Sequence, residues 1–373
     1  MTAPAAHDSK APSAAKFPTF GLPIWTLAVP LVGAFAVVAG LSGGLAITVI
    51  LGLLLAGAIM AAVFHAEVLA HYLGEPFGTL VLALAVTIIE TSLIVSIMLS
   101  EGSQAQALAR DTLIAAIMIT INGFVGICLL VGGGRHHEQS YTQSGVSVGL
   151  AMLATLAVLT LILPNFTVSE RGPFYTPTQL VFVAVISLVV YGTFVVAQTI
   201  RHRDHFLHKR PDAEPVIHAP VPRSQALAAA GMMVLTLVTV VLLAKKLSPS
   251  IEAGVAAVGA PQALVGIIIA TLVLAPEGFA ALSAARANRV QTSLNLSIGS
   301  ALATIGLTIP AVAIAALTMG LDLELGLSMR STVLLALTLL VAALTLSTGR
   351  TTFVQGVIHL VIFVTYLFIT IFP

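Results

Sequence analysis

Two glutamates in this sequence lie in the middle of long apolar segments. Glu90 lies in the segment 77–99, and Glu277 lies in the segment 262–284. A helix rises about 1.5 Å per residue, so both carboxyl groups would lie well inside a lipid bilayer. An ionised carboxylate at that depth costs about 2.5–3.5 kcal/mol. No Lys or Arg lies in the middle of any such segment to offset this cost. Each glutamate must therefore be protonated, bound to a cation or exposed to water.

A cation/proton antiporter needs these three states in turn. Two carboxylates are neutralised either by two protons or by one divalent cation. Because one site cannot hold both loads at once, competition between them couples the two fluxes. The alternative is that both glutamates stay protonated and only form hydrogen bonds inside a helical bundle. Intramembrane acids are functional by default, which favours the transport interpretation.

Neutral oxygen ligands are expected in the apolar segments that follow the two glutamates. Hard cations prefer carboxylate, amide, hydroxyl and carbonyl oxygens. Asn122 lies in the segment after Glu90, and Ser300 and Thr304 lie in the segment after Glu277. The alternative for these three polar side chains is hydrogen bonding between helices or to their own backbone.

The composition shows what kind of molecule must hold these residues. The chain has 373 residues, of which 58% are hydrophobic and 8% charged, and its net charge is +1. A soluble domain has roughly 25% charged residues, so a water-soluble enzyme is excluded. The lack of a basic face also excludes a nucleic-acid-binding protein. A polytopic membrane protein remains, with the lipid bilayer as its partner.

About eleven apolar segments are long enough to cross the hydrocarbon core, which requires about 20 residues. They are continuous rather than alternating, which excludes a membrane β-barrel and predicts an all-α protein. The segments are 22–41, 44–64, 77–99, 110–131, 145–164, 178–200, 224–244, 262–284, 290–316, 329–347 and 352–371.

Prolines predict irregular helix in two places. Pro276 precedes Glu277, and a broken helix there would free backbone carbonyls near the carboxylate. Pro249 and Pro261 bracket a short Ala/Gly-rich stretch. We interpret this stretch as an interfacial helix or a re-entrant segment.

Polar segments divide the chain into five parts. Residues 1–20 are predicted to be a disordered cytoplasmic tail, and 21–43 a leading transmembrane span. Residues 201–223 form a cytoplasmic loop rich in basic residues and histidine. These histidines could bind Zn²⁺ or sense pH, although a solvated basic loop is the simpler interpretation. The remaining segments, 44–200 and 224–373, would each form a repeat of five helices.

The two repeats place the glutamates symmetrically. Glu90 lies in the second span of its repeat, and Glu277 lies in the second span of the other. An odd number of spans per repeat inverts the second repeat in the membrane. With a cytoplasmic N-terminus, eleven of the 16 Lys and Arg residues would lie on the cytoplasmic side. This bias predicts that orientation.

The residues around both glutamates form two related motif clusters. The first includes Gly74-Glu75-Pro76-Phe77-Gly78-Thr79, Glu90, Arg110-Asp111-Thr112 and Asn122-Gly123; the second includes Ala275-Pro276-Glu277-Gly278, Arg286-Ala287-Asn288-Arg289, Gly299-Ser300-Ala301-Leu302-Ala303-Thr304 and Ile305-Gly306-Leu307-Thr308-Ile309-Pro310. They resemble the cation/calcium exchanger superfamily, especially Ca²⁺(Na⁺)/H⁺ antiporters of the ChaA and CAX type. This resemblance implies a sodium/calcium exchanger-like fold, with one leading span and two inverted five-helix repeats. It also implies that Glu90 and Glu277 bind the cation and carry protons.

The sequence departs from the family's pattern near the glutamates. Many CAX members carry Gly-Asn before the repeat glutamate, where this chain has apolar residues and Pro276. The family's Gly-Ser-x-x-Ser-Asn pattern matches at Asn122 in the first repeat. In the second it matches Gly299-Ser300, with Thr304 in place of the Asn. The missing amides leave room for Na⁺ or K⁺ beside Ca²⁺.

The sequence therefore predicts a secondary-active antiporter that exports Ca²⁺, or Na⁺ or K⁺, in exchange for H⁺. The expected metal ligands are Glu90, Glu277, Asn122, Ser300 and Thr304, and the two glutamates would also carry the protons. A passive cation channel is the alternative function. We expect no enzymatic activity, no resident cofactor and no nucleic-acid partner. The expected location is a bacterial inner (plasma) membrane, and a homo-oligomer is left open.

Overall fold

A computed structural model describes residues 21–74, 77–102, 106–206, 221–261 and 263–372. The predicted tail 1–20 lies outside the described residues, and so does most of the predicted loop 201–223, because residues 207–220 are not described. The other predicted segments can be compared with the structure.

The described chain is almost entirely helical. Nine of its helices are long and apolar enough to cross a membrane, and two shorter apolar helices, Ile24–Val38 and Leu84–Leu99, bring the total among the described residues to eleven. The α-helical segments of these spans, with α4 and α5 belonging to the same span, are α1 (Ile24–Val38), α2 (Gly44–Leu73), α3 (Phe77–Glu101), α4 (Leu108–Ile117), α5 (Val125–His136), α6 (Gln143–Ala157), α7 (Pro177–Val196), α8 (Arg223–Ala257), α9 (Ala263–Arg286), α10 (Val290–Met319), α11 (Met329–Leu346) and α12 (Phe353–Ile371). The predicted all-α membrane fold is confirmed.

Short non-α segments join some of these helices. The π-helical segment η2 (Met118–Phe124) connects α4 to α5 without a break, so that α4, η2 and α5 form one span. The other such segments are η3 (Val158–Ile162), η4 (Leu163–Phe166), η5 (Ala197–Arg201) and η6 (Arg203–His205). Two short strands, β1 (Gln139–Ser140) and β2 (Arg350–Thr351), pair antiparallel at one end of the bundle.

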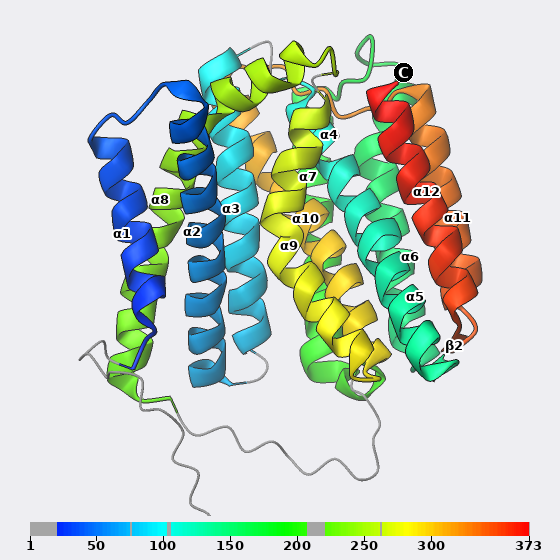
Figure 1. Ribbon diagram of the computed structural model, residues 1–373. Coiled ribbons are helices and arrows are strands. Elements are labelled where there is room, and N and C mark those ends of the chain that lie inside the picture. Colours follow the sequence, from blue (N-terminus) through cyan, green and yellow to red (C-terminus); the bar gives the residue numbers. More distant parts are fainter. Residues whose placement is uncertain (1–20, 75–76, 103–105, 207–220, 262, 373) are drawn as a thin grey trace, which may run out of the picture.

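The spans follow the predicted order of one leading helix and two sets of five. α1 lies against α2 and α8, which begin the two sets and pack along each other. Figure 1 shows α1, α2, α3 and α8 on one side of the bundle and α11 and α12 on the opposite side. Because each set has five spans, the second set is inverted relative to the first.

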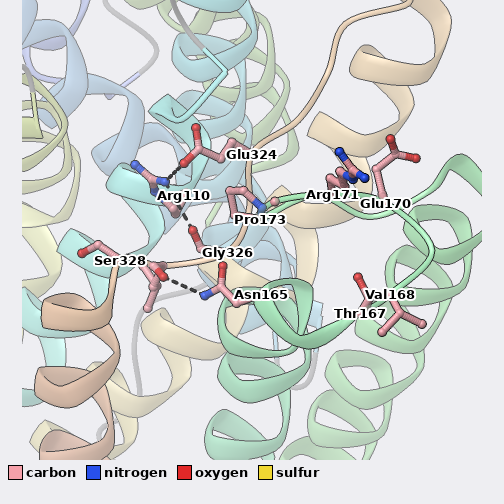
Figure 2. Close-up of a pocket in the computed structure, with 12 residues that line it drawn as sticks. Arg110, Asn165, Thr167, Val168, Glu170, Arg171, Pro173, Glu324, Gly326 and Ser328 are labelled. Atoms are coloured by element: carbon pink, nitrogen blue, oxygen red, sulfur yellow. Dashed lines mark hydrogen bonds and ion pairs between the residues drawn. The ribbon is translucent and has the colours of Figure 1, made fainter.

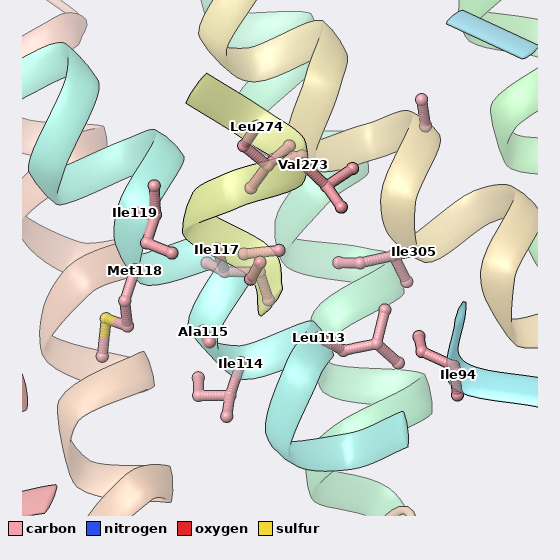
Figure 3. Close-up of a cluster of buried hydrophobic side chains, with 14 of the residues drawn as sticks. Ile94, Leu113, Ile114, Ala115, Ile117, Met118, Ile119, Val273, Leu274 and Ile305 are labelled. Carbon is pink, nitrogen blue, oxygen red and sulfur yellow. The ribbon is translucent and has the colours of Figure 1, made fainter. Parts of the chain in front are cut away.

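The span made by α4, η2 and α5 forms the centre of the bundle. Every residue from 112 to 123 is buried. A helix that is apolar all round must be surrounded by other helices. Figure 3 shows its Leu113 and Ile117 among side chains of α3, α9 and α10, such as Ile94, Val273 and Ile305. Both repeats therefore share one core, which fixes α3, α9 and α10 relative to each other.

Two expectations about proline are wrong. Pro276 lies inside the continuous helix α9, so the predicted break does not occur there. Pro249 lies inside α8, which continues to Ala257 as a single helix rather than ending before a separate interfacial segment. Neighbouring helices can stabilise a proline in a membrane helix by re-satisfying the freed backbone groups.

Candidate cation and proton site

The two intramembrane glutamates meet on one face of α10. The Thr304 hydroxyl donates a hydrogen bond of 2.9 Å to Oε2 of Glu90, which lies on α3. The Ser300 hydroxyl donates a hydrogen bond to Oε2 of Glu277, which lies on α9. Ser300 and Thr304 are four residues apart, so about 6 Å along the helix axis separates them. The structure thus brings together four of the five predicted ligands.

The site is enclosed by the bundle. Glu90 is 1% exposed, Thr304 2% and Ser300 8%, while Glu277 is partly buried. The Oε1 atom of Glu90 is buried and has no hydrogen-bond partner among the described residues. An unpartnered carboxylate oxygen at this depth is costly, so it needs a proton or a cation.

No basic side chain neutralises either glutamate within the described chain. The ion pairs found there join Arg110 to Asp111 and Glu324, and Arg350 to Glu138. The Glu90 and Glu277 carboxylates bond to hydroxyls that lie one helical turn apart on α10. Two like charges in a low-dielectric site repel each other, and a shared cation or protons would relieve that repulsion.

The polar face of α10 continues one turn beyond Thr304. The hydroxyl of Thr308 lies 3.2 Å from that of Thr91, the residue that follows Glu90 on α3. The sequence analysis missed this pair as part of the site. The spacing of four residues between Ser300, Thr304 and Thr308 was the signal that could have found it.

A model of the sodium/calcium exchanger protein family matches residues 43–200 and 228–372. These two segments contain both glutamates and both hydroxyls of the site. The chain belongs to the sodium/calcium exchanger family.

Curated relatives match nearly the whole chain. A putative ionic transporter, y4hA, of Sinorhizobium fredii is 44% identical over 357 residues, which cover 94% of this chain and 97% of the relative. The sodium-potassium/proton antiporter ChaA of Escherichia coli is 36% identical over 340 residues, which cover 89% of this chain and 92% of the relative. The predicted resemblance to the ChaA and CAX type is therefore confirmed.

Solved exchangers share the fold. The crystal structure of an H⁺/Ca²⁺ exchanger, CAX, superposes with a TM-score of 0.72 at 16% identity, covering 92% of this chain and 87% of that chain. The structure of native YfkE gives a TM-score of 0.70 at 15% identity, covering 94% of this chain and 99% of that chain. The predicted sodium/calcium exchanger-like fold is confirmed.

Asn122 lies apart from the hydrogen bonds of the two glutamates. Its Nδ2 donates to the Thr338 hydroxyl at 2.8 Å, and its Oδ1 lies 3.0 Å from Nδ1 of His359. Both polar groups of the amide are therefore engaged with α11 and α12. The role of Asn122 as a metal ligand stays a prediction, and these contacts point to a different one.

The composition of the site also limits what it can bind. Among the described residues, no group of three or more His, Cys, Asp or Glu side chains could hold a metal ion. The two carboxylates and two hydroxyls are oxygen donors of the kind that hard cations prefer. In the predicted basic loop, His202 and His205 stack with ring centroids 5.3 Å apart, and His208 lies outside the described residues.

A surface hollow of about 610 Å³ lies where α4 begins, and it is separate from the glutamate pair. Figure 2 shows Arg110 reaching Glu324 and the carbonyl of Gly326 on the segment before α11. The side-chain amide of Asn165 donates a hydrogen bond of 2.7 Å to the carbonyl of Leu327 on the same segment. These bonds fasten the segment 320–328 across this end of the bundle.

Proposed function

We propose that this protein is a cation/proton antiporter in which Glu90 and Glu277 alternately bind a cation and protons. The observation that carries this proposal is the pair of carboxylates on one face of α10, with no basic partner among the described residues. The relative from Escherichia coli, named a sodium-potassium/proton antiporter, and the family match support the same activity.

Exchange follows from competition for the same oxygens. When both glutamates are protonated, neither carboxyl group carries a charge, so the site is neutral without a metal. An entering divalent cation displaces both protons, whereas a monovalent cation displaces one and leaves the other carboxyl group protonated. In either case the cation takes the freed carboxylate oxygens. The Ser300 and Thr304 hydroxyls stay bonded to the carboxylates and present lone pairs to the cation. A site that held neither protons nor a cation would carry uncompensated carboxylate charge inside the membrane. This cost opposes movement of the empty transporter between its two open states.

The cation is proposed to be Na⁺ or K⁺ first, and Ca²⁺ second. The relative from Escherichia coli is named for Na⁺ and K⁺, and the two carboxylates and two hydroxyls offer six oxygens, which is the lower limit of the about 6–8 that Ca²⁺ takes. Since the amide of Asn122 is engaged elsewhere, it does not add to this number. The sequence analysis placed Ca²⁺ first, and a relative named as a Ca²⁺/H⁺ antiporter, from Aphanothece halophytica, keeps it as a candidate.

The surroundings of the transporter are part of the proposal. The eleven apolar helices make it an integral membrane protein. We propose a bacterial inner membrane because the two relatives come from bacteria, and a cytoplasmic N-terminus because of the distribution of Lys and Arg. Cations and protons are its cargo, and no resident cofactor or catalytic activity is required. A passive cation channel would need a file of sites along a wet pathway rather than one enclosed carboxylate pair.

Everted membrane vesicles test this proposal. Respiration acidifies their interior and quenches a pH-sensitive dye, and Na⁺, K⁺ or Ca²⁺ is then added in turn. We expect dequenching with at least one cation, and its loss in Glu90→Gln and Glu277→Gln. Glu138→Gln is the matched control, since Glu138 pairs with Arg350 on the exposed surface and should exchange as the native protein does. Absence of dequenching with every cation from neutral to alkaline pH would contradict antiport. Cation flux that persists without any counter-movement of protons would support the channel.

A further inference from the structure

A buried hydrogen-bond network joins the centre of the bundle to α11 and α12. Asn122 is fully buried between Thr338 of α11 and His359 of α12. The other ring nitrogen of His359, Nε2, lies 2.9 Å from the hydroxyl of Thr345 on α11. With its proton on Nδ1, the ring donates to Asn122, and Nε2 faces the Thr345 hydroxyl, which also lies 2.7 Å from the carbonyl of Val341. A satisfied network of this kind fixes the geometry of the helices that it joins.

This network holds a π-helical turn. Asn122 lies in η2, and the side chain of Met118, at the start of the same segment, also contacts both Asn122 and Thr338. A π-turn inserts one residue relative to an α-helix and occurs often at functional sites. If the turn reverted to α-helix, all residues after it would rotate by about 100°. The side-chain bonds of Asn122 therefore act at the point that sets the register of α5.

The packing of α12 delivers His359 to this turn. Gly356 lies against the backbone of α5, because a Cβ there would lie 2.4 Å from the nitrogen of Leu130. Gly126 of α5 leaves room in the same way for Leu360 of α12. Glycines at these two positions let the helices approach closely, about one turn from the contact between His359 and Asn122 and on the same side of it.

The other side of the π-turn touches the helix that carries Glu277. The ring of Phe124, the last residue of η2, lies against Gly278, where an added Cβ would be 2.5 Å from the ring atoms. Gly278 follows Glu277 directly on α9. Four residues beyond Phe124, Cys128 packs against Ala281 and Ala285 of the same helix. A rotation of η2 and α5 would therefore change which side chains pack against α9 next to Glu277.

We infer that His359 is a positioning residue for the cation site: through Asn122 it holds the π-turn in register, so that Phe124 supports α9 and keeps Glu277 at the Ser300 hydroxyl. Asn122 then serves the site by holding this turn rather than by binding the cation. The inference rests on the proposed role of Glu277 in transport, but the register of the turn can be measured without any transport.

Cys128 provides that independent measurement, because it is the only cysteine of the chain and is 1% exposed. We would alkylate membranes with N-ethylmaleimide and compare native protein, His359→Leu and His359→Gln. Leucine removes both polar contacts, whereas the glutamine amide can still donate to Asn122 and reach the Thr345 hydroxyl. Thr236→Val is the matched control, since it removes a buried hydroxyl of α8 that donates a hydrogen bond to the carbonyl of Met232 on the same helix.

We expect Cys128 to react in His359→Leu and to stay protected in the native protein, in His359→Gln and in the control. In vesicles, His359→Leu should raise the cation concentration for half-maximal exchange by about tenfold, within the range of coupling between packed residues. Glutamine should restore it. Unchanged Cys128 protection in His359→Leu would overturn the inference, and so would reactivity that glutamine fails to suppress. If the native protein exchanged no cation, the proposed function would fail, while the protection of Cys128 would still decide the register of the turn.

Discussion

Replacing Thr304 by valine tests the hydrogen bond that holds Glu90. The substitution keeps the shape of the side chain and removes only the donor that lies 2.9 Å from Oε2 of Glu90. A hydrogen bond to a charged group contributes about 1.5–3 kcal/mol, and one to a neutral group about 0.5–1.5 kcal/mol. The hydroxyl therefore favours the ionised, cation-bound carboxylate over the protonated one by about 1–1.5 kcal/mol. This difference corresponds to an apparent cation affinity about 5- to 12-fold lower in Thr304→Val at fixed pH.

The assay is the cation concentration that gives half-maximal dequenching in everted vesicles. Thr304→Ser keeps the hydroxyl and should lie within about twofold of the native protein. Thr308→Val should have a smaller effect, because that hydroxyl bonds to the neutral Thr91. Thr236→Val removes a buried hydroxyl that bonds within α8, so it reports the cost of losing a buried hydroxyl in general. A half-maximal concentration in Thr304→Val equal to that of Thr236→Val would refute the assigned role of Thr304.

Three further predictions concern stability. Gly278→Ala should lower the thermal stability of the purified protein by about 1–3 kcal/mol through overpacking against Phe124, and a second substitution, Phe124→Ala, should recover part of it. Arg110→Gln should cost about 1–3 kcal/mol in the same measurement, because it leaves two partly buried carboxylates without their cation, whereas Arg350→Gln, in an exposed pair, should cost under about 1 kcal/mol. Burial raises the pKa of Tyr175, in the segment before α7, to about 12 from 10.0. A group whose folded pKa is raised loses its stabilising contribution as the pH rises, so part of the stability should disappear between these two pH values. This alkaline decline should be smaller in Tyr175→Phe. Equal losses in the two arginine variants, or the same alkaline decline in Tyr175→Phe, would contradict these assignments.

The sequence predicts the spans and the glutamate pair well because both signals are local. Continuous apolar segments of the required length fix the eleven helices, and an acid in such a segment stands out without any tertiary knowledge. Ser300 and Thr304 are recognisable because four residues make about one helical turn. Their bonds to Glu277 and Glu90 then follow from the packing of α3 and α9 on α10.

The remaining features depend on contacts that are distant in the sequence. Asn122 pairs with His359, which lies 237 residues further along the chain, so the sequence analysis could not distinguish this contact from cation binding. The π-turn leaves no trace in hydrophobic periodicity, because every residue from 112 to 123 is buried and no apolar face is distinguished from a polar one. Pro276 predicts a broken helix by local rules, and the bundle around α9 overrides that preference.

Proton release on cation binding tests the central claim most directly. Calorimetry of the purified protein, titrated with Na⁺, K⁺ or Ca²⁺ in buffers of different ionisation enthalpy, measures the protons released per bound cation. The account predicts release by the native protein, reduced release in Glu90→Gln and in Glu277→Gln, and none in the double variant. Cation binding without proton release, or undiminished release in the double variant, would contradict a site that cations and protons share.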